Sequence, residues 1–107
     1  MRYQLVLQFR GASLADYDQM IALEDRLIKE LGHCAKVDGH DCGSGETNIF
    51  ILTSDPAATF WRVRQTLKQE GRLESLGAAY RPIKGEQLSE EFTVVWPEGS
   101  TEEFTVA

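Results

Sequence analysis

The chain has few cysteines, no long apolar run and no excess of basic residues, and each shortage argues against a class of protein. Its two cysteines are too few for a disulfide framework, and a globule of 107 residues buries enough apolar surface to fold without one. The longest aliphatic and aromatic run, residues 49–52, is too short to cross a bilayer. Because polar and apolar residues alternate after Met1, we expect no secretory leader. We expect a cytoplasmic protein with reduced thiols and no membrane partner.

The shortage of positive charge bears on the binding partner. Acidic residues outnumber basic ones by 17 to 11, which gives a net charge of −6. A surface of this sign repels phosphate backbones, so we expect no nucleic-acid partner. It attracts basic proteins, which remain suitable partners. We see no linker or low-complexity tract, and therefore expect one domain over residues 1–107.

The first half of the chain predicts a strand, a helix and a hairpin. Residues 3–9 alternate as a half-buried strand does. Ser13 is a suitable N-cap for a helix over residues 14–31, which Gly32 ends. Strands over 35–41 and 47–53 then flank a Gly-Ser-Gly turn. The first helix is expected to bury one broad apolar face and to leave its acids solvated; the face comprises Tyr17, Met20, Ile21, Leu27, Ile28 and Leu31, and the acids include Glu24 and Glu30.

The second half predicts a helix, a strand and an appendage. Asp55 and Pro56 are the N-cap and first residue of a helix that Gly71 ends. A strand follows over 78–83. Residues 90–107 read as a C-terminal β-hairpin, with arms at 92–96 and 104–106, that extends the sheet or pairs with a second copy. The aromatic residues expected in the core are Phe60, Trp61 and Phe92.

This order of elements predicts an α+β fold. Strand, helix, strand, strand, helix, strand is the split βαββαβ arrangement called ferredoxin-like, with an antiparallel sheet in the order 4-1-3-2 and both helices on one face. We expect residues 1–84 to form this core. Strand 4 would then be an edge, which suits Pro82. Strand 2 would be the other edge, which suits Lys36, Asp38 and Gly39.

Residues 33–53 hold both cysteines and both histidines, so zinc is the first chemistry to consider. The stretch lacks the paired C-x-x-C or H-x-x-x-H spacing of zinc sites. If Ala35 and Val37 face the core, strand alternation sends another set of side chains the opposite way. That set is Cys34, Lys36, Asp38, His40 and Cys42. We interpret it as a polar edge strand and expect no metal or cofactor.

Three other sites fit the same stretch poorly. A disulfide between Cys34 and Cys42 fails because the residues between them span about 26 Å when extended, whereas bridged Cα atoms lie at most about 7 Å apart. Ser44 with His40 and a nearby aspartate has the residue types of a catalytic triad, but it lies in a glycine turn and not on a rigid element. A phosphate loop needs a lysine where Glu46 stands. This leaves no catalytic signature and favours a non-enzymatic role.

The remaining candidate is the sheet face that the helices leave open. It should carry Gln4, Val6, Gln8 and Arg10, together with Asp38 and His40. The third strand contributes either Asn48 and Phe50 or Ile49 and Ile51, and the fourth contributes Tyr80 or Arg81. Apolar groups, amides and opposite charges together are typical of a binding face. A second subunit or the C-terminal hairpin could equally cover it. The binding-face candidates are Gln4, Gln8, Arg10, Asp38, His40, Asn48, Tyr80 and Arg81.

The order of elements and the stretch Gly-x-Gly-Glu-Thr-Asn-Ile-Phe-Ile-Leu-Thr-Ser-Asp-Pro at residues 43–56 resemble small, uncharacterised bacterial proteins of ferredoxin-like fold. The resemblance covers about residues 1–84 and implies a regulatory or immunity-type module, with no transferred site residue. We expect a non-enzymatic interaction module that binds a basic protein or a second copy of itself. The alternative is a small dimeric enzyme or sensor with a pocket between sheets, lined by Gln8, His40 and Asn48.

Overall fold

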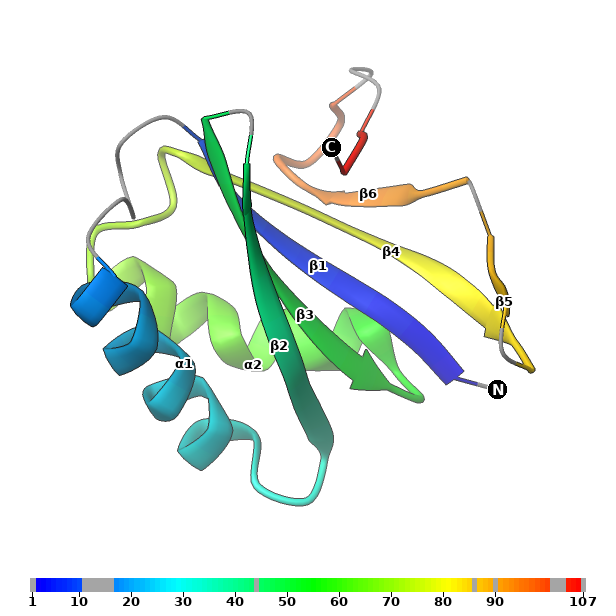
Figure 1. Cartoon of the computed structure of the whole chain (residues 1–107), viewed down its shortest axis with the longest axis horizontal. Helices are drawn as coiled ribbons and strands as arrows, with labels where there is room; N and C mark the ends of the chain where they lie inside the picture. The colour runs from blue at the N-terminus through cyan, green and yellow to red at the C-terminus, as the bar shows by residue number, and fades with distance from the viewer. Residues whose placement is uncertain are drawn as a thin grey trace.

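Two helices cover one face of an antiparallel sheet in the computed structural model of the chain (Figure 1). The structure describes residues 2–10, 17–43, 45–85, 87–89, 91–100 and 104–106. The elements in chain order are β1 (Arg2–Arg10), α1 (Tyr17–Leu31), β2 (Ala35–Gly43), β3 (Glu46–Thr53), α2 (Pro56–Gln69), β4 (Leu76–Lys84), β5 (Gln87–Leu88) and β6 (Thr93–Trp96). The predicted α+β class with an antiparallel sheet is confirmed.

The helix ends follow the local sequence signals. The Asp55 side chain accepts a hydrogen bond from the Ala58 N–H at 3.1 Å, and Pro56 opens α2 as expected. Gly32, with φ of 54°, follows the last residue of α1 and donates its N–H to the Ile28 carbonyl at 3.1 Å. Ser13, the predicted N-cap of the first helix, lies outside the described residues. Local capping therefore sets three of the four helix ends, since Gly71 (φ 70°) follows α2 closely.

The strand order along the sheet is β2-β3-β1-β4-β5, and β6 also pairs with β4. β4 is therefore not an edge strand, which corrects the prediction. Pro82 is tolerated because β6 pairs with residues 78–80 and β5 with residues 83–84, so it lies between the two outer strands. The Pro82 carbonyl accepts the Ser89 N–H at 3.2 Å on that outer side. The missing N–H of the proline faces the same side and costs no bond to β1.

The main core lies between the helices and the sheet. It comprises Leu5, Leu7 and Phe9 of β1, Met20, Leu23, Leu27 and Leu31 of α1, Ile49 and Ile51 of β3, Phe60, Val63 and Leu67 of α2, and Leu76 and Ala78 of β4. Tyr17 and Ile28, expected in this core, are 63% and 51% exposed. The buried side of α1 is narrower than predicted, and it includes Leu23 and Glu24 in place of Tyr17 and Ile28. Trp61 is 61% exposed because it lies one residue, a rotation of about 100°, beyond Phe60.

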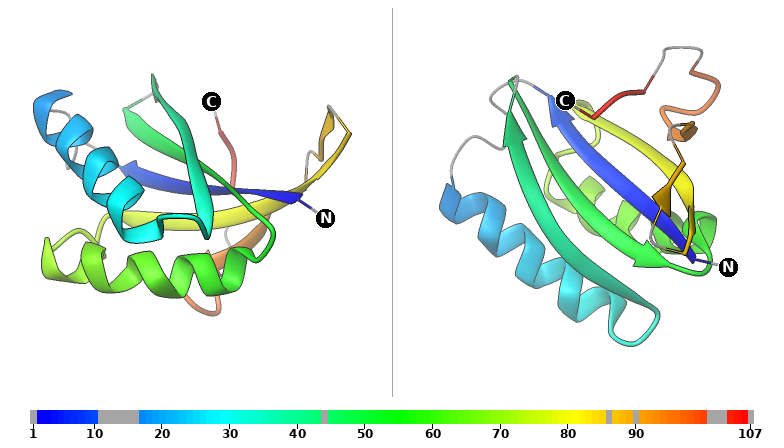
Figure 2. Two further views of the ribbon diagram at one scale, coloured as in Figure 1. Left: turned by 90° about the horizontal axis from the view of Figure 1, so that it is seen from below. Right: turned by 45° about the vertical axis from the view of Figure 1, so that its right-hand side comes forward.

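A smaller cluster lies on the opposite face of the sheet. Val6, Ala79 and Phe104 form it, with Phe92 half-buried against them. The segment 104–106 carries no strand, and β6 pairs with β4, so the predicted pairing of two C-terminal arms is not found in the described residues. Instead, the C-terminal residues lie over the face that the helices leave open (Figure 2). Within the described ranges, no helix is long and apolar enough to span a membrane.

Candidate functional site

Cross-strand register decides which side chains share the face opposite the helices. Gln8 of β1 lies beside Asn48 of β3, and Val6 lies beside Phe50. Of the two sets considered for β3, Asn48 and Phe50 therefore face this side. Gln4 lies beside Arg81 of β4. Arg81 thus belongs to the face.

Tyr80 lies on the other face, which corrects its assignment to the open side. Its register partner on β1 is Leu5, a residue of the main core. Its ring packs edge-on against Tyr3, with centroids 5.6 Å apart. Arg10, at the end of β1, is exposed and keeps its place on the open side, where its guanidinium Nη2 comes within 3.3 Å of the position that a Cβ on Gly77 would occupy.

The C-terminal residues close the centre of this face. The Gln8 side-chain amide donates to Asn48 Oδ1 at 3.1 Å and to the Thr105 carbonyl at 2.8 Å. Gln8 and Asn48 are each 2% exposed. Phe104 packs against Phe92, with ring centroids 5.0 Å apart. These polar groups therefore satisfy each other and hold the C-terminal residues in place.

Arg81 makes polar contacts at the Gln4 end of the same sheet face. Its Nε donates to Gln4 Oε1 at 2.8 Å, and its Nη1 donates to the Ser89 carbonyl at 3.2 Å. The guanidinium lies 4.6 Å from the centroid of the Phe92 ring. Burial lowers the pKa of Arg81, but a guanidinium stays protonated at ordinary pH. Gln4 and Arg81, both predicted to bind a partner, are thus engaged within the chain.

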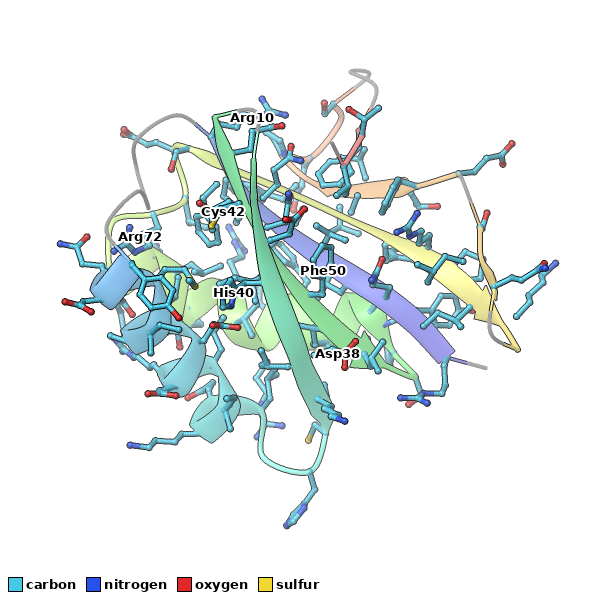
Figure 3. All side chains as sticks on the ribbon, viewed as in Figure 1. Arg10, Asp38, His40, Cys42, Phe50 and Arg72 are labelled. Carbon is cyan, nitrogen blue, oxygen red and sulfur yellow. The ribbon has the colours of Figure 1, made fainter. Side chains whose placement is uncertain are left out.

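A β-bulge moves His40 to the helix side of β2. The register between β2 and β3 shifts between Val37 and Gly39, and Gly39 has a φ of 127°. One extra residue reverses the alternation beyond it. Asp38 and His40 therefore lie on opposite sides of β2 (Figure 3). The prediction that Asp38 and His40 share the open face is therefore wrong for His40.

On the helix side, His40 meets a buried acid. Its Nδ1 lies 2.8 Å from Glu24 Oε1 of α1, and the Tyr17 ring stands edge-on at 6.1 Å between centroids. Glu24 is 8% exposed, whereas we expected a solvated carboxylate. The hydrogen bond to His40 explains the difference, because a buried carboxylate needs a hydrogen-bonded partner. No sequence pattern linked these residues, which lie on a helix and on a bulged strand.

The two cysteines do not join a common site. The Arg62 Nη1 lies 2.8 Å from Cys34 Sγ, while Cys42 Sγ lies 3.8 Å from Thr47 Oγ1. Both cysteines are free thiols and exposed. Within the described residues, no group of three His, Cys, Asp or Glu side chains could hold a metal ion. Ser44, the serine of the triad considered above, lies outside the described residues.

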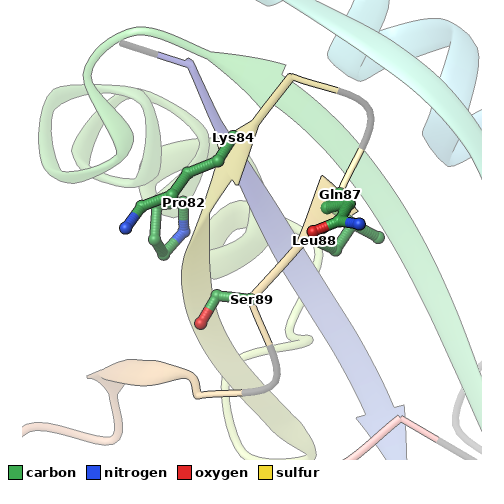
Figure 4. Close-up of a pocket in the computed structure, with 5 residues that line it drawn as sticks. All are labelled: Pro82, Lys84, Gln87, Leu88 and Ser89. Carbon is green, nitrogen blue, oxygen red and sulfur yellow. The ribbon is translucent and has the colours of Figure 1, made fainter.

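A pocket of about 230 Å³ lies at the turn between β4 and β5 (Figure 4). Its lining consists of Pro82, Lys84, Gln87, Leu88 and Ser89. It is smaller than the pockets that usually hold organic ligands, which start at about 300 Å³. None of Gln8, His40 and Asn48, the residues expected to line a pocket between sheets, borders it. Those three do not share a cavity, because His40 faces the helices.

The part of the face over β2 and β3 remains accessible. Phe50 and Leu52 of β3 are half-buried, and Leu52 lies opposite Lys36 of β2. Asp41 lies opposite Asn48 and is exposed, as is Asp38 at the bulge. We call this surface the β2–β3 face: Lys36, Asp38, Asp41, Glu46, Phe50 and Leu52. It combines apolar side chains with a border of carboxylates.

No protein-family model matches the chain, and neither a curated protein nor a solved structure matches it significantly.

Proposed function

We propose that the protein is a non-enzymatic interaction module that binds a basic segment of a partner protein on the β2–β3 face. The proposal rests on one observation: residues 104–106 cover only part of the sheet face that the helices leave open. Phe104 packs on Val6 and the Thr105 carbonyl bonds to Gln8, yet Phe50 at the border of this cluster and Leu52 stay half-buried beside Asp38 and Asp41. Apolar anchors with a charged rim are typical of protein interfaces.

The charge of this surface favours a basic partner. Asp38 and Asp41 project from β2 and Glu46 from β3, with Lys36 at the far end. The chain as a whole carries a net charge of −6, which attracts a cationic segment over distances longer than the contact itself. In a lysine- or arginine-rich segment with one or two apolar residues, the cations match the acidic border of the β2–β3 face and the apolar residues match its centre, Phe50 and Leu52.

Binding across the face is favoured over strand addition to β2. The outer edge of β2 has no paired strand in the described part of the chain. However, the bulge between Val37 and Gly39 breaks the regular row of backbone donors and acceptors that an added strand needs. Bulges of this kind protect edges from pairing. Side chains on the face, and not the backbone of the edge, are therefore the recognition elements.

We also infer that the core formed by β1 to β4 with both helices is of the ferredoxin-like kind, extended by β5 and β6. The pairing of β1 with both β3 and β4 supports this inference. A regulatory or immunity-type role in a bacterial cell agrees with it, since such modules act by binding. The fold alone names no partner.

The test uses a fluorescein-labelled octapeptide of alternating lysine and leucine. We expect fluorescence anisotropy to show binding that weakens about tenfold when Asp38 and Asp41 are both replaced by asparagine. A similar loss is expected for Phe50→Ala. Binding should also weaken with added salt, because the screening length falls to about 8 Å at physiological ionic strength.

Asp18→Asn with Asp25→Asn is the matched control, since both are exposed acids on α1. This pair removes the same charge from the other side of the molecule and should leave the peptide affinity within about twofold. Equal losses in the two double variants would mean that the peptide responds only to net charge. That result would refute the β2–β3 face as the binding site.

A further inference from the structure

The solvent side of α2 is basic and carries an exposed tryptophan. The helix contains three basic residues, Arg62, Arg64 and Lys68, and no aspartate or glutamate. Trp61 is 61% exposed between them. On the opposite side, Phe60, Val63 and Leu67 hold the helix on the sheet. This concentration of positive charge is unusual in a chain with a net charge of −6.

Arg64 is held between two indole rings. Its Cζ lies 5.1 Å from the centroid of the Trp61 ring and 5.1 Å from that of the Trp96 ring. Trp96 is fixed in turn, because its Nε1 donates to the Leu73 carbonyl at 3.3 Å and its ring packs on Phe60 at 6.2 Å between centroids. The guanidinium is thus stacked in a defined orientation.

The hydrogen-bond donors of Arg64 are not used within the described part of the chain. Its Nε is buried and has no hydrogen-bond partner there. A guanidinium offers five N–H donors in a planar fork that matches a carboxylate. An arginine stacked by aromatic rings loses little side-chain entropy on binding. Because the buried Nε cannot reach a group in solvent, the two terminal Nη groups are the donors of Arg64 that can receive an anionic group from outside.

We propose that α2 docks a short carboxylate-rich segment of a partner protein. The contact surface, which we call the α2 face, comprises Trp61, Arg64, Gln65 and Lys68. Trp61 and Arg64 belong to the residue types that dominate binding energy at protein interfaces. Lys68 supplies further positive charge one turn along the same side of the helix. The partner's carboxylates bond to Arg64, and its apolar groups pack on Trp61.

The extent of the positive surface favours an acidic peptide over a nucleic acid. Asp55 precedes α2 and Glu70 follows it, so the basic stretch is limited to the 14 residues of the helix. Such a helix is about 21 Å long. A nucleic acid strand continues beyond this length and meets the acidic remainder of the chain. A few glutamates or aspartates fit within the helix.

The α2 face and the β2–β3 face lie on opposite layers of the molecule. α2 packs beneath the sheet, and the C-terminal residues lie above it (Figure 2). One partner on each surface would not collide with the other. The interaction at the α2 face therefore goes beyond the proposed function. With both surfaces occupied, the protein would hold an acidic partner and a basic partner at the same time.

The probe for the α2 face is a fluorescein-labelled octaglutamate peptide, and anisotropy is the measurement. We expect Arg64→Glu and Lys68→Glu each to weaken binding at least tenfold, and Trp61→Ala at least fivefold. Lys68 has an exposed side chain, so its variant keeps the test valid if Arg64→Glu fails to fold. Lys29→Glu and Ile28→Ala, at exposed positions of α1, are the controls and should change the affinity by less than twofold.

Three results would overturn the proposal. The first is no binding of octaglutamate at millimolar peptide, and the second is an equal loss in Lys29→Glu. The third is tighter binding of a labelled twelve-residue thymidine oligonucleotide than of the peptide. The variant with Asp38→Asn and Asp41→Asn should bind octaglutamate as the unchanged protein does. Failure of one surface is therefore distinguishable from failure of the other.

Discussion

At the scale of single residues, Glu24 has the most unexpected environment. Its carboxylate lies at the buried side of α1 and reaches His40 of β2 at 2.8 Å. Burying such a group without a partner costs free energy, whereas a hydrogen bond to a charged group contributes about 1.5–3 kcal/mol. The pair also connects the first helix to the edge strand.

Replacing Glu24 by alanine should therefore lower the free energy of unfolding by about 1–2 kcal/mol. Urea denaturation followed by circular dichroism measures this change. Glu30→Ala is the control, because Glu30 is an exposed acid of the same helix and should change stability by less than about 0.5 kcal/mol. A double-mutant cycle with His40→Ala should give a coupling free energy above about 0.5 kcal/mol. Strict additivity would show that the contact between Glu24 and His40 contributes nothing.

At the scale of elements, the bulge in β2 decides which residues share a face. Gly39 has a φ of 127°, a conformation that L-residues other than glycine rarely adopt. It places Asp38 beside the sheet face and His40 beside α1. The β2–β3 face and the contact between His40 and Glu24 depend on this arrangement, since a regular strand would send Asp38 and His40 the same way.

Gly39→Ala should destabilise the protein by about 1–3 kcal/mol through backbone strain. Gly43→Ala is a matched control on the same strand, because a Cβ meets nothing within 4 Å at either position and only Gly39 has a positive φ. The control should be close to neutral. Thermal unfolding of both variants compares them directly. Equal melting temperatures would mean that Gly39 needs no left-handed conformation.

At the scale of the whole molecule, residues 104–106 cover part of the sheet face that the helices leave open. Phe104 is 8% exposed against Val6 and Ala79, and the Thr105 carbonyl accepts the Gln8 amide. The cover makes the open face asymmetric. It leaves the β2–β3 face as the accessible part, which is why the binding proposal concerns that half.

Phe104→Ala should cost about 3 kcal/mol of stability and loosen the cover. The Gln8 side-chain amide resonances report on it in an NMR spectrum, because Gln8 loses a fixed acceptor when Thr105 moves. Thr105→Ala is the control, since this side chain is exposed and the residue contributes its backbone carbonyl. Unchanged Gln8 resonances in Phe104→Ala would contradict the role of Phe104 in holding the segment.

Local signals predicted most of the fold. The alternation of residues 3–9 located β1, and Asp55 with Pro56 located the start of α2, because caps and side-chain alternation act within a few residues. The face of His40 was not predictable, since it depends on where the extra residue of β2 sits relative to β3. The burial of Glu24 was not predictable either, because its partner is set by tertiary packing.

The candidate site was predicted in part for the same reason. Strand alternation identified Gln4, Gln8 and Arg10 as one face, and register confirmed Asn48 and Arg81 as their neighbours. Alternation contains no information on what covers a face, so the engagement of Gln8 by Thr105 was missed. Trp61 was assigned to the core from its apolar character alone; the basic residues around it were the signal for an exposed position.

The bond between Gln8 and Thr105 has a consequence for the order of folding. It joins residues 97 positions apart, whereas the neighbouring bond from Gln8 to Asn48 spans 40. Closing the longer loop costs more chain entropy, and contacts of high sequence separation form slowly. We therefore expect the bond from Gln8 to Thr105 to form after the bond from Gln8 to Asn48. Until that contact forms, Val6 and Ala79 lack their contact with Phe104, and a chaperone or a binding partner competes with residues 104–106 for them.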